Sequence, residues 1–138
     1  MKKNLVFIII VIIFIIIACL FITDTPNIQN GMHYLVDIDN VDNKLIYDNK
    51  KLIDISEKCL KIAKVNILNK SSHEFKPYGF TLLYLLSESH YSLHTWPEKN
   101  KIRIDLFSCS DKKDCQLGIE YLKTQFTNSN IYIQKVIR

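Results

Sequence analysis

An apolar run that leads straight into a dense polar cluster is the feature that most constrains how this chain folds. Residues Phe80–Leu86 are almost entirely apolar, and the segment Ser87–Glu98 behind them holds carboxylates, serines, two histidines and the only tryptophan of the chain. Such a run is typical of a buried strand that carries polar groups to a site at its end. A plain polar turn between two strands is the alternative, and composition taken alone favours it.

The amino-terminal segment is separate from this domain. Leu5–Ile22 is a stretch of eighteen apolar residues without a charge, preceded by Lys2 and Lys3. About 20 such residues cross a bilayer as a helix, whereas the apolar part of a cleaved signal peptide has only about 7–15 residues. We therefore predict a single transmembrane helix that anchors the protein, over residues 1–22. Residues 16–19, Ile-Ile-Ala-Cys, resemble a bacterial lipoprotein cleavage site, which is the alternative.

A polar segment at 23–30 reads as a linker, and the compact domain is expected over 31–138. The side of the membrane follows from the basic residues that flank the span, because the richer side is usually cytoplasmic. Two lysines precede the span, and the first basic residue after it is Lys44. This asymmetry predicts a single-pass protein whose domain lies on the extracytoplasmic or lumenal side.

The composition of the chain argues against two classes of site. The formal net charge is +4, and the basic residues are scattered, so no basic stripe interleaved with aromatics indicates a nucleic-acid partner. The four cysteines lack the paired spacing of a metal site, and we predict no metal. They are Cys19, Cys59, Cys109 and Cys115. Cys59 falls on the apolar side of an expected helix, where a thiol behaves as a small hydrophobe.

The periodicity of apolar residues predicts an α+β fold. Strands are expected at 33–38, 65–68, 80–86, 90–95, 102–107 and 131–137, and amphipathic helices at 52–63 and 115–126. Residues 40–49 read as a loop, in which 45–47 can form a short extra element. This order indicates a two-layer sandwich, with two helices on one face of a largely antiparallel sheet. The 108 residues from Gly31 onward suffice for a single modest core.

The polar cluster closely resembles a family signature. Glu88-Ser89-His90, then His94-Thr95-Trp96-Pro97-Glu98, then Ile104 to Cys109, is similar to the bacterial and archaeal S-adenosylmethionine decarboxylases. The likeness extends upstream over 72–81 and downstream over 119–123, and it covers the chain from Gly31 to its end. It implies the same two-layer fold, a homodimer with both active sites near the interface, and a role in spermidine and other polyamine biosynthesis.

The resemblance also implies that the protein is a zymogen that makes its own pyruvoyl cofactor. The hydroxyl of Ser89 would attack the carbonyl of Glu88, and elimination of the resulting ester would cut the chain between residues 88 and 89. Hydrolysis of the dehydroalanine leaves a pyruvoyl group at the start of the second chain. His94 matches the histidine that handles protons in this processing, and Thr81 matches a hydroxyl that assists it.

For decarboxylation, the resemblance implies a Schiff base between the amine of S-adenosylmethionine and the pyruvoyl ketone, which withdraws the electrons released as carbon dioxide leaves. Cys109 matches the donor that protonates the resulting carbanion. Phe75 matches an aromatic that stacks on adenine. Trp96 and Glu98 belong to the signature and are expected to line the substrate pocket.

The alternation of side chains along a strand tests this assignment. On one straight strand, Ser89 and His94 point to opposite faces. They can meet within one chain only if it bends or turns between them. The end of the apolar run at Leu86 favours a turn near Ser89.

Three departures from the family pattern leave alternatives open. Lys99-Asn100-Lys101 replaces the usual Tyr-Gly-Tyr, Ser110 replaces a glycine, and the anchor is unusual. A pyruvoyl-dependent arginine or ornithine decarboxylase is one alternative, and a catalytically inactive regulatory relative is another. The anchor also raises a conflict, because an oxidising compartment can couple Cys109 to Cys115 and remove the proton donor.

Overall fold

The computed structural model describes residues 31–87 and 89–137. The predicted anchor at 1–22, the linker at 23–30 and Glu88 lie outside the described residues. Within the described ranges, no helix is both long and apolar enough to cross a membrane. The strands are β1 (Met32–Asp39), β2 (Ile67–Glu74), β3 (Phe80–Leu86), β4 (Ser89–Trp96), β5 (Lys101–Ser108) and β6 (Asn130–Ile137). The helices are α2 (Asn43–Ile46), α3 (Asn49–Ile62) and α4 (Lys112–Gln125), with a 3-10 turn at Pro97–Lys99.

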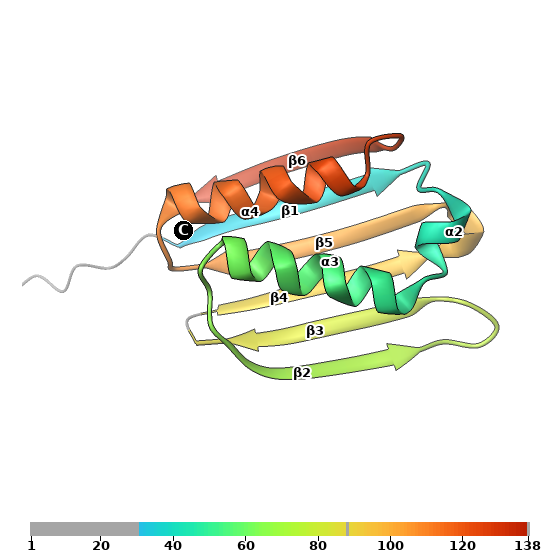
Figure 1. Cartoon of the computed structure of the whole chain (residues 1–138), viewed down its shortest axis with the longest axis horizontal. Helices are drawn as coiled ribbons and strands as arrows, with labels where there is room; N and C mark the ends of the chain where they lie inside the picture. Colours follow the sequence, from blue (N-terminus) through green and yellow to red (C-terminus); the bar gives the residue numbers. More distant parts are fainter. Residues whose placement is uncertain (1–30, 88, 138) are drawn as a thin grey trace, which may run out of the picture.

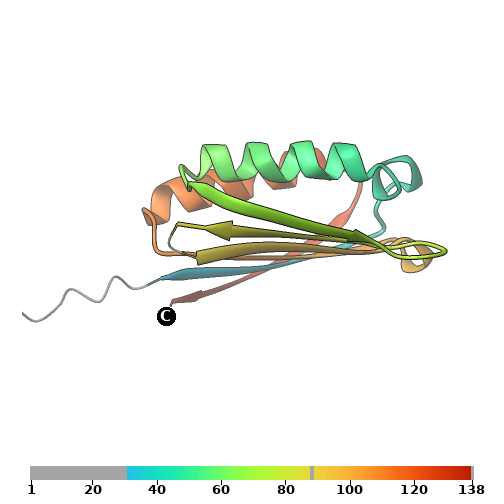
Figure 2. The same cartoon turned by 90° about the horizontal axis from the view of Figure 1, so that it is seen from below.

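The described strands form one six-stranded sheet in the order β2-β3-β4-β5-β1-β6 (Figure 1). Every neighbouring pair is antiparallel. The two long helices, α3 and α4, lie side by side on one face of this sheet, and no helix of the described residues lies on the opposite face (Figure 2). The predicted two-layer α+β fold with an antiparallel sheet is therefore confirmed.

Side-chain alternation divides each central strand between the two faces. In β4, Tyr91, Leu93 and Thr95 are buried beneath the helices, whereas His90 and Trp96 are exposed on the open face. Strand β5 alternates in the same way, as expected for a sheet with one covered face. The open face is therefore where polar side chains of β1, β4 and β5 gather.

The edge strand β2 is longer than the sequence predicted. Its eight residues are all exposed, so its polar second half shows no period-two alternation for a pattern to detect. Pairing with β3 extends it to Glu74.

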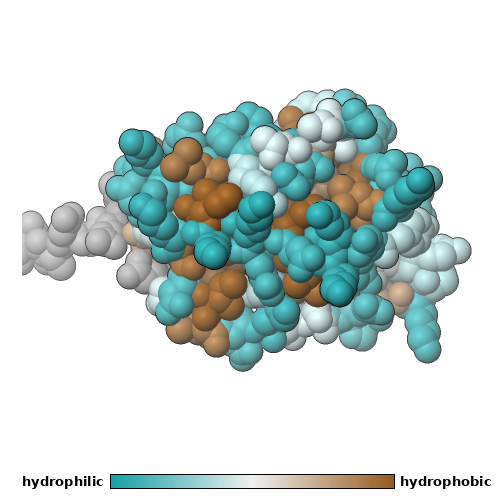
Figure 3. All heavy atoms as spheres, in the orientation of Figure 1, coloured by the Kyte–Doolittle hydropathy of each residue, from teal (hydrophilic) through white to brown (hydrophobic). Residues whose placement is uncertain are grey.

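Helix α3 also begins earlier than expected, at Asn49, because the Asp48 side chain accepts a hydrogen bond from the backbone N–H of Lys51. Hydrophilic side chains cover most of the outer surface of the helix layer (Figure 3).

Helices α3 and α4 approach closely at Gly118. A Cβ added there would lie 2.8 Å from the backbone oxygen of Cys59 and 3.1 Å from the Ala63 Cβ. We predict that Gly118→Ala lowers the free energy of unfolding. Overpacking costs about 1–3 kcal/mol, whereas the higher helix propensity of alanine stabilises by only about 1 kcal/mol. Urea unfolding of the full-length chain measures the change. Gln116→Ala, at an exposed position of α4, is the control and should shift stability by less than about 0.5 kcal/mol.

Candidate active site

Ser89 is the first residue of β4 and follows the turn that joins it to β3. Its hydroxyl oxygen is buried and has no hydrogen-bond partner among the described residues. A small cavity of about 130 Å³ lies beside it, lined in part by Ser87, Ser108 and Ser110. A buried hydroxyl without a partner is uncommon in folded proteins and calls for an explanation. Ser89 is the residue that the resemblance predicts to attack the adjacent peptide carbonyl.

Ser110, one of the departures from the family pattern, belongs to the same cavity. Its hydroxyl lies 2.7 Å from the Ser108 hydroxyl and 3.2 Å from the Cys115 sulfur. These contacts direct it toward the helix layer, on the side of the sheet to which Ser89 also points. The change from glycine therefore lies at the Ser89 end of the sheet.

Cys109 lies just beyond the end of β5, at the same end of the sheet as Ser89, since His90 pairs with Phe107 in the β4–β5 ladder. Cys109 is partly exposed and is a free thiol. A Cβ built at Gly31 would lie 3.5 Å from the Cys109 sulfur and 2.4 Å from the Phe107 ring. Glycine is thus required at residue 31 for this packing, which holds the thiol beside the start of β1.

The other two cysteines of the described chain are structural. Cys59 and Cys115 are fully buried in the helix layer, as the sequence predicted for Cys59. Burial raises the pKa of the Cys59 thiol to about 12, so it stays protonated and unreactive at neutral pH.

Thr81 and His94 form a hydroxyl–imidazole pair on the open face. They are directly opposite in the β3–β4 ladder, and the Thr81 hydroxyl lies 2.9 Å from Nδ1 of His94. The family resemblance assigns proton handling to His94 and its assistance to Thr81, and the structure places the two side chains in contact.

The aromatic residues predicted to hold the substrate lie near this pair. The Trp96 ring is 6.1 Å from the His94 ring, and the Phe75 ring packs edge-on against His73 at 4.6 Å. Phe75 and Trp96 are 51% and 39% exposed, and Glu98 is exposed in the 3-10 turn. Large apolar rings held in solvent are a mark of a binding surface.

The structure does not bring Ser89 and His94 together within one chain. Strand β4 runs without interruption from Ser89 to Trp96, so the two residues are about 16 Å apart along it at roughly 3.3 Å per residue. They also point to opposite faces, as the alternation of side chains along a strand predicted. The expected turn precedes Ser89 and does not fall between the two residues. The predicted residues therefore divide between the Ser89 end of the sheet, which also holds Cys109, and a group around the Thr81–His94 pair.

Charged residues surround the Thr81–His94 pair. Arg103 lies opposite His94 in the β4–β5 ladder and forms ion pairs with Asp37 at 3.1 Å and Asp39 at 2.9 Å. The hydrogen bond from Arg103 lowers the pKa of the Asp39 carboxyl. An open cleft of about 720 Å³ lies here, and its lining includes His94, Arg103 and Tyr132. This cleft gives the open face room for a ligand or a partner surface.

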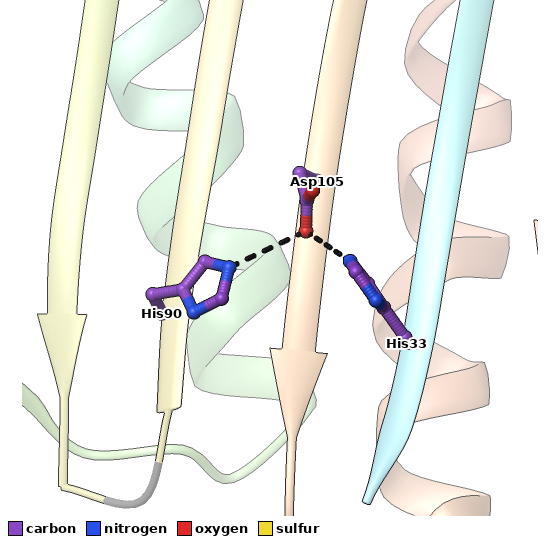
Figure 4. A group of neighbouring side chains, drawn as sticks. All are labelled: His33, His90 and Asp105. Carbon is purple, nitrogen blue, oxygen red and sulfur yellow. Dashed lines mark hydrogen bonds and ion pairs between the residues drawn. The ribbon is translucent and has the colours of Figure 1, made fainter. Parts of the chain in front are cut away.

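The sequence prediction missed a cluster of His33, His90 and Asp105 on the open face (Figure 4). The His33 Nε2 lies 2.6 Å from the Asp105 Oδ1. The three residues are far apart in the sequence and come from β1, β4 and β5. They come together only because β1 lies next to β5 in the sheet, and no local sequence pattern indicates that strand order.

Comparisons with known proteins identify the family of the chain. The family model described as S-adenosylmethionine decarboxylase matches residues 32–138. The chain belongs to the S-adenosylmethionine decarboxylase family. The resemblance found in the Glu88–Glu98 signature is thereby confirmed.

Individual members of the S-adenosylmethionine decarboxylase family cover the same part of the chain. A protein of Bacillus cereus, named S-adenosylmethionine decarboxylase proenzyme 2, is 38% identical over 78% of this chain and 88% of its own length. The S-adenosylmethionine decarboxylase proenzyme of Thermoplasma volcanium is 32% identical over 78% of this chain and 83% of its own. The crystal structure of the Aquifex aeolicus adenosylmethionine decarboxylase superposes with a TM-score of 0.72 at 30% identity, covering 79% of this chain and 90% of that one.

Proposed function

We propose that this chain is a self-processing, pyruvoyl-dependent S-adenosylmethionine decarboxylase that supplies polyamine biosynthesis. Membership of the family supports the reaction class and the cofactor. The observation that carries the proposal in this chain is the buried Ser89 hydroxyl, which has no hydrogen-bond partner among the described residues and lies directly after the β3–β4 turn.

In the processing reaction, the Ser89 hydroxyl adds to the carbonyl of residue 88. The acyl group moves from nitrogen to oxygen, and loss of the ester then cuts the chain. A serine hydroxyl is a weak nucleophile unless a base accepts its proton. The paired Thr81 hydroxyl and His94 imidazole provide a group that can accept and return that proton. We assign His94 to proton transfer and Thr81 to its orientation.

In the decarboxylation reaction, the pyruvoyl ketone derived from Ser89 supplies the electron sink. The partly exposed Cys109 thiol, at the same end of the sheet, is positioned to donate a proton to the substrate carbon. Phe75 provides a flat face for the adenine ring, and an aromatic face also suits a sulfonium cation. Trp96 and Glu98 complete the proposed substrate contacts.

The separation of Ser89 from His94 favours an active site shared between two protomers. Proton transfer requires the participating heavy atoms within about 2.6–3.2 Å or one intervening water, which a strand of about 16 Å does not allow. In a two-fold dimer each surface meets its own copy. Pairing of the open faces with opposed strand directions places the Thr81–His94 pair of one protomer over the Ser89 end of the other, where the Ser89 side chain must turn from the helix face to the open face to meet it.

The open face has the composition of such an interface. Several large apolar side chains are exposed on it without any helix to cover them. They are Leu83 at 45%, Leu85 at 56%, Trp96 at 39% and Tyr132 at 63% exposure. Apolar groups gathered on one face favour association. We therefore propose a homodimer joined through the open face of the sheet.

Replacement of Cys109 separates processing from turnover. We predict that Cys109→Ala retains cleavage between residues 88 and 89, because the thiol takes no part in the acyl shift. Turnover of the cleaved enzyme should fall by about 100-fold or more, since a positioned proton donor contributes roughly 10²–10⁴-fold. Intact-mass analysis gives the cleaved fraction, and carbon dioxide release normalised to it gives turnover. Full activity per cleaved chain would contradict the assignment of Cys109.

The substrate is tested by carbon dioxide release from labelled S-adenosylmethionine, arginine and ornithine, offered separately to the same cleaved preparation. We expect release from S-adenosylmethionine. Release from arginine or ornithine alone would replace the proposed substrate by a basic amino acid. The regulatory alternative would be favoured if this chain stays uncut and has no activity of its own, both when it is alone and when it is mixed with a related active enzyme.

We also propose that residues 1–22 tether the protein to a membrane, with the domain on the extracytoplasmic or lumenal side. Support comes from the eighteen apolar residues and from Lys2 and Lys3 before them. Protease treatment of sealed, right-side-out membranes tests the orientation, since only an outer domain is digested without opening them. The requirement of a free Cys109 thiol for activity is the main argument for the opposite side.

A further inference from the structure

We propose that His33, His90 and Asp105 form a binding site for a divalent transition-metal ion such as Zn²⁺. None of these residues has a part in the reaction proposed above. The site therefore stands or fails independently of the decarboxylase activity.

The geometry of the three side chains suits a single ion. The Asp105 Oδ1 lies 2.6 Å from the His33 Nε2 and 3.5 Å from the His90 Nε2, and the three ligand atoms all lie within 4.8 Å of one another. Bound zinc holds nitrogen and oxygen ligands at about 2.0–2.2 Å, which places tetrahedral neighbours about 3.4 Å apart. The observed separations bracket this value, so rotation of the side chains is sufficient to form the site.

The scaffold positions these side chains from three adjacent strands. His33 and His90 are both opposite Phe107 in their ladders with β5, and Asp105 lies two residues before Phe107 on the same face. The Phe107 ring packs against both imidazoles, with ring centroids 5.6 Å from His33 and 5.9 Å from His90. Ligands on strands with a shared packing partner are held more precisely than ligands on loops. All three side chains converge above β5 in Figure 4.

The donor atoms select the class of metal. Two imidazole nitrogens and one carboxylate oxygen suit zinc, cobalt, iron and similar ions, whereas magnesium and calcium prefer oxygen ligands alone. In the single chain the side chains of His33, His90 and Asp105 are 14%, 52% and 33% exposed, so an ion can enter from solvent before the open faces pair. Three protein ligands leave a further coordination position for water or for a group on a second protomer.

Occupation of this site would have a structural consequence at the cleavage point. His90 follows Ser89 directly, and cleavage turns Ser89 into the first residue of a separate chain. A metal ion on His90, Asp105 and His33 would tie that chain end to β5 and β1. The ion would then stabilise the end of the sheet where the continuous chain is lost.

The test is a titration of the untagged full-length chain, freed of metal with a chelator, with Co²⁺ and then Zn²⁺. We expect saturation at one Co²⁺ per chain, visible d–d absorption without thiolate charge-transfer bands, and displacement by Zn²⁺ but not by excess Mg²⁺. His33→Gln, His90→Gln and Asp105→Asn should each weaken binding at least about tenfold. His73→Gln removes another histidine of the sheet and should leave the affinity unchanged.

Several outcomes would overturn the site. They are no saturable binding, thiolate charge transfer that places the ion on cysteine, or equal loss of affinity in His73→Gln. Zn²⁺ should also raise the unfolding temperature of the unsubstituted chain, because an ion that binds only the folded state stabilises it. Asp105→Asn keeps the side-chain shape and should lose this rise. A rise that persists in Asp105→Asn would place the ion elsewhere, even if the histidine variants fail to fold.

Discussion

Ser89→Ala leaves the chain at its full length and abolishes decarboxylation. The alanine has no hydroxyl to add to the carbonyl of residue 88, so neither the ester nor the pyruvoyl group can form. The unsubstituted chain should yield fragments 1–88 and 89–138. The second fragment should lack the mass of one ammonia relative to a serine amino terminus. Intact-mass analysis reads both results directly, and carbon dioxide release should fall to background because no electron sink remains.

The matched control for this variant is Ser92→Ala, which removes a hydroxyl from the same strand, three residues later. It should be cleaved between residues 88 and 89 like the unsubstituted chain. Cleavage of Ser89→Ala at this bond, or activity of its uncut chain, would exclude the self-processing mechanism.

The sequence predicted the elements that have a clear apolar pattern. Strand β3 was predicted from Phe80 to Leu86 and has those bounds, because its apolar run ends where the polar cluster begins. In the structure its side chains alternate between the helix layer and the open face. Strand β2 was underestimated, because all of its residues are exposed and its extent depends on pairing with β3. The helix face with Cys59 was predicted correctly because its burial follows helical spacing.

The chemistry of the site was predicted from a local signature, and its distribution in space was not. Side-chain parity did indicate that Ser89 and His94 face opposite ways, but the continuity of β4 between them is a property of the completed sheet. The His33–His90–Asp105 cluster was missed because it depends on β1 lying next to β5. Strand order is set by the packing of the whole domain, so no single segment of the sequence indicates it.

Two inactive variants should together form one working processing site when they share a dimer. Alone, Ser89→Ala has no nucleophile, and His94→Ala lacks the proposed proton-transfer group. In a mixed dimer with a shared site, Ser89 of the His94→Ala chain meets His94 of the Ser89→Ala chain. One complete site forms per mixed dimer. We predict that co-expression leads to cleavage of the His94→Ala chain only.

The experiment distinguishes a shared site from one contained in a single chain. Different tags on the two variants let intact-mass analysis assign each fragment to its parent. Random pairing at equal expression places about half of the His94→Ala chains in mixed dimers, so cleavage of up to about half of them is expected. If His94 acted within its own chain, co-expression would leave both variants uncut, because no chain contains both residues.

Disruption of the open face provides the control for this complementation. Leu85 is 56% exposed there, on β3, and a lysine at this position would place charges against the partner's apolar surface. Leu85→Lys, introduced into both co-expressed chains, should convert the dimer to monomers in sedimentation and abolish cleavage of the His94→Ala chain. Cleavage that persists in monomers would show that the Thr81–His94 pair is not supplied by a partner. Persistence of the dimer would instead place the interface away from the open face, because a charge buried without a partner is strongly unfavourable.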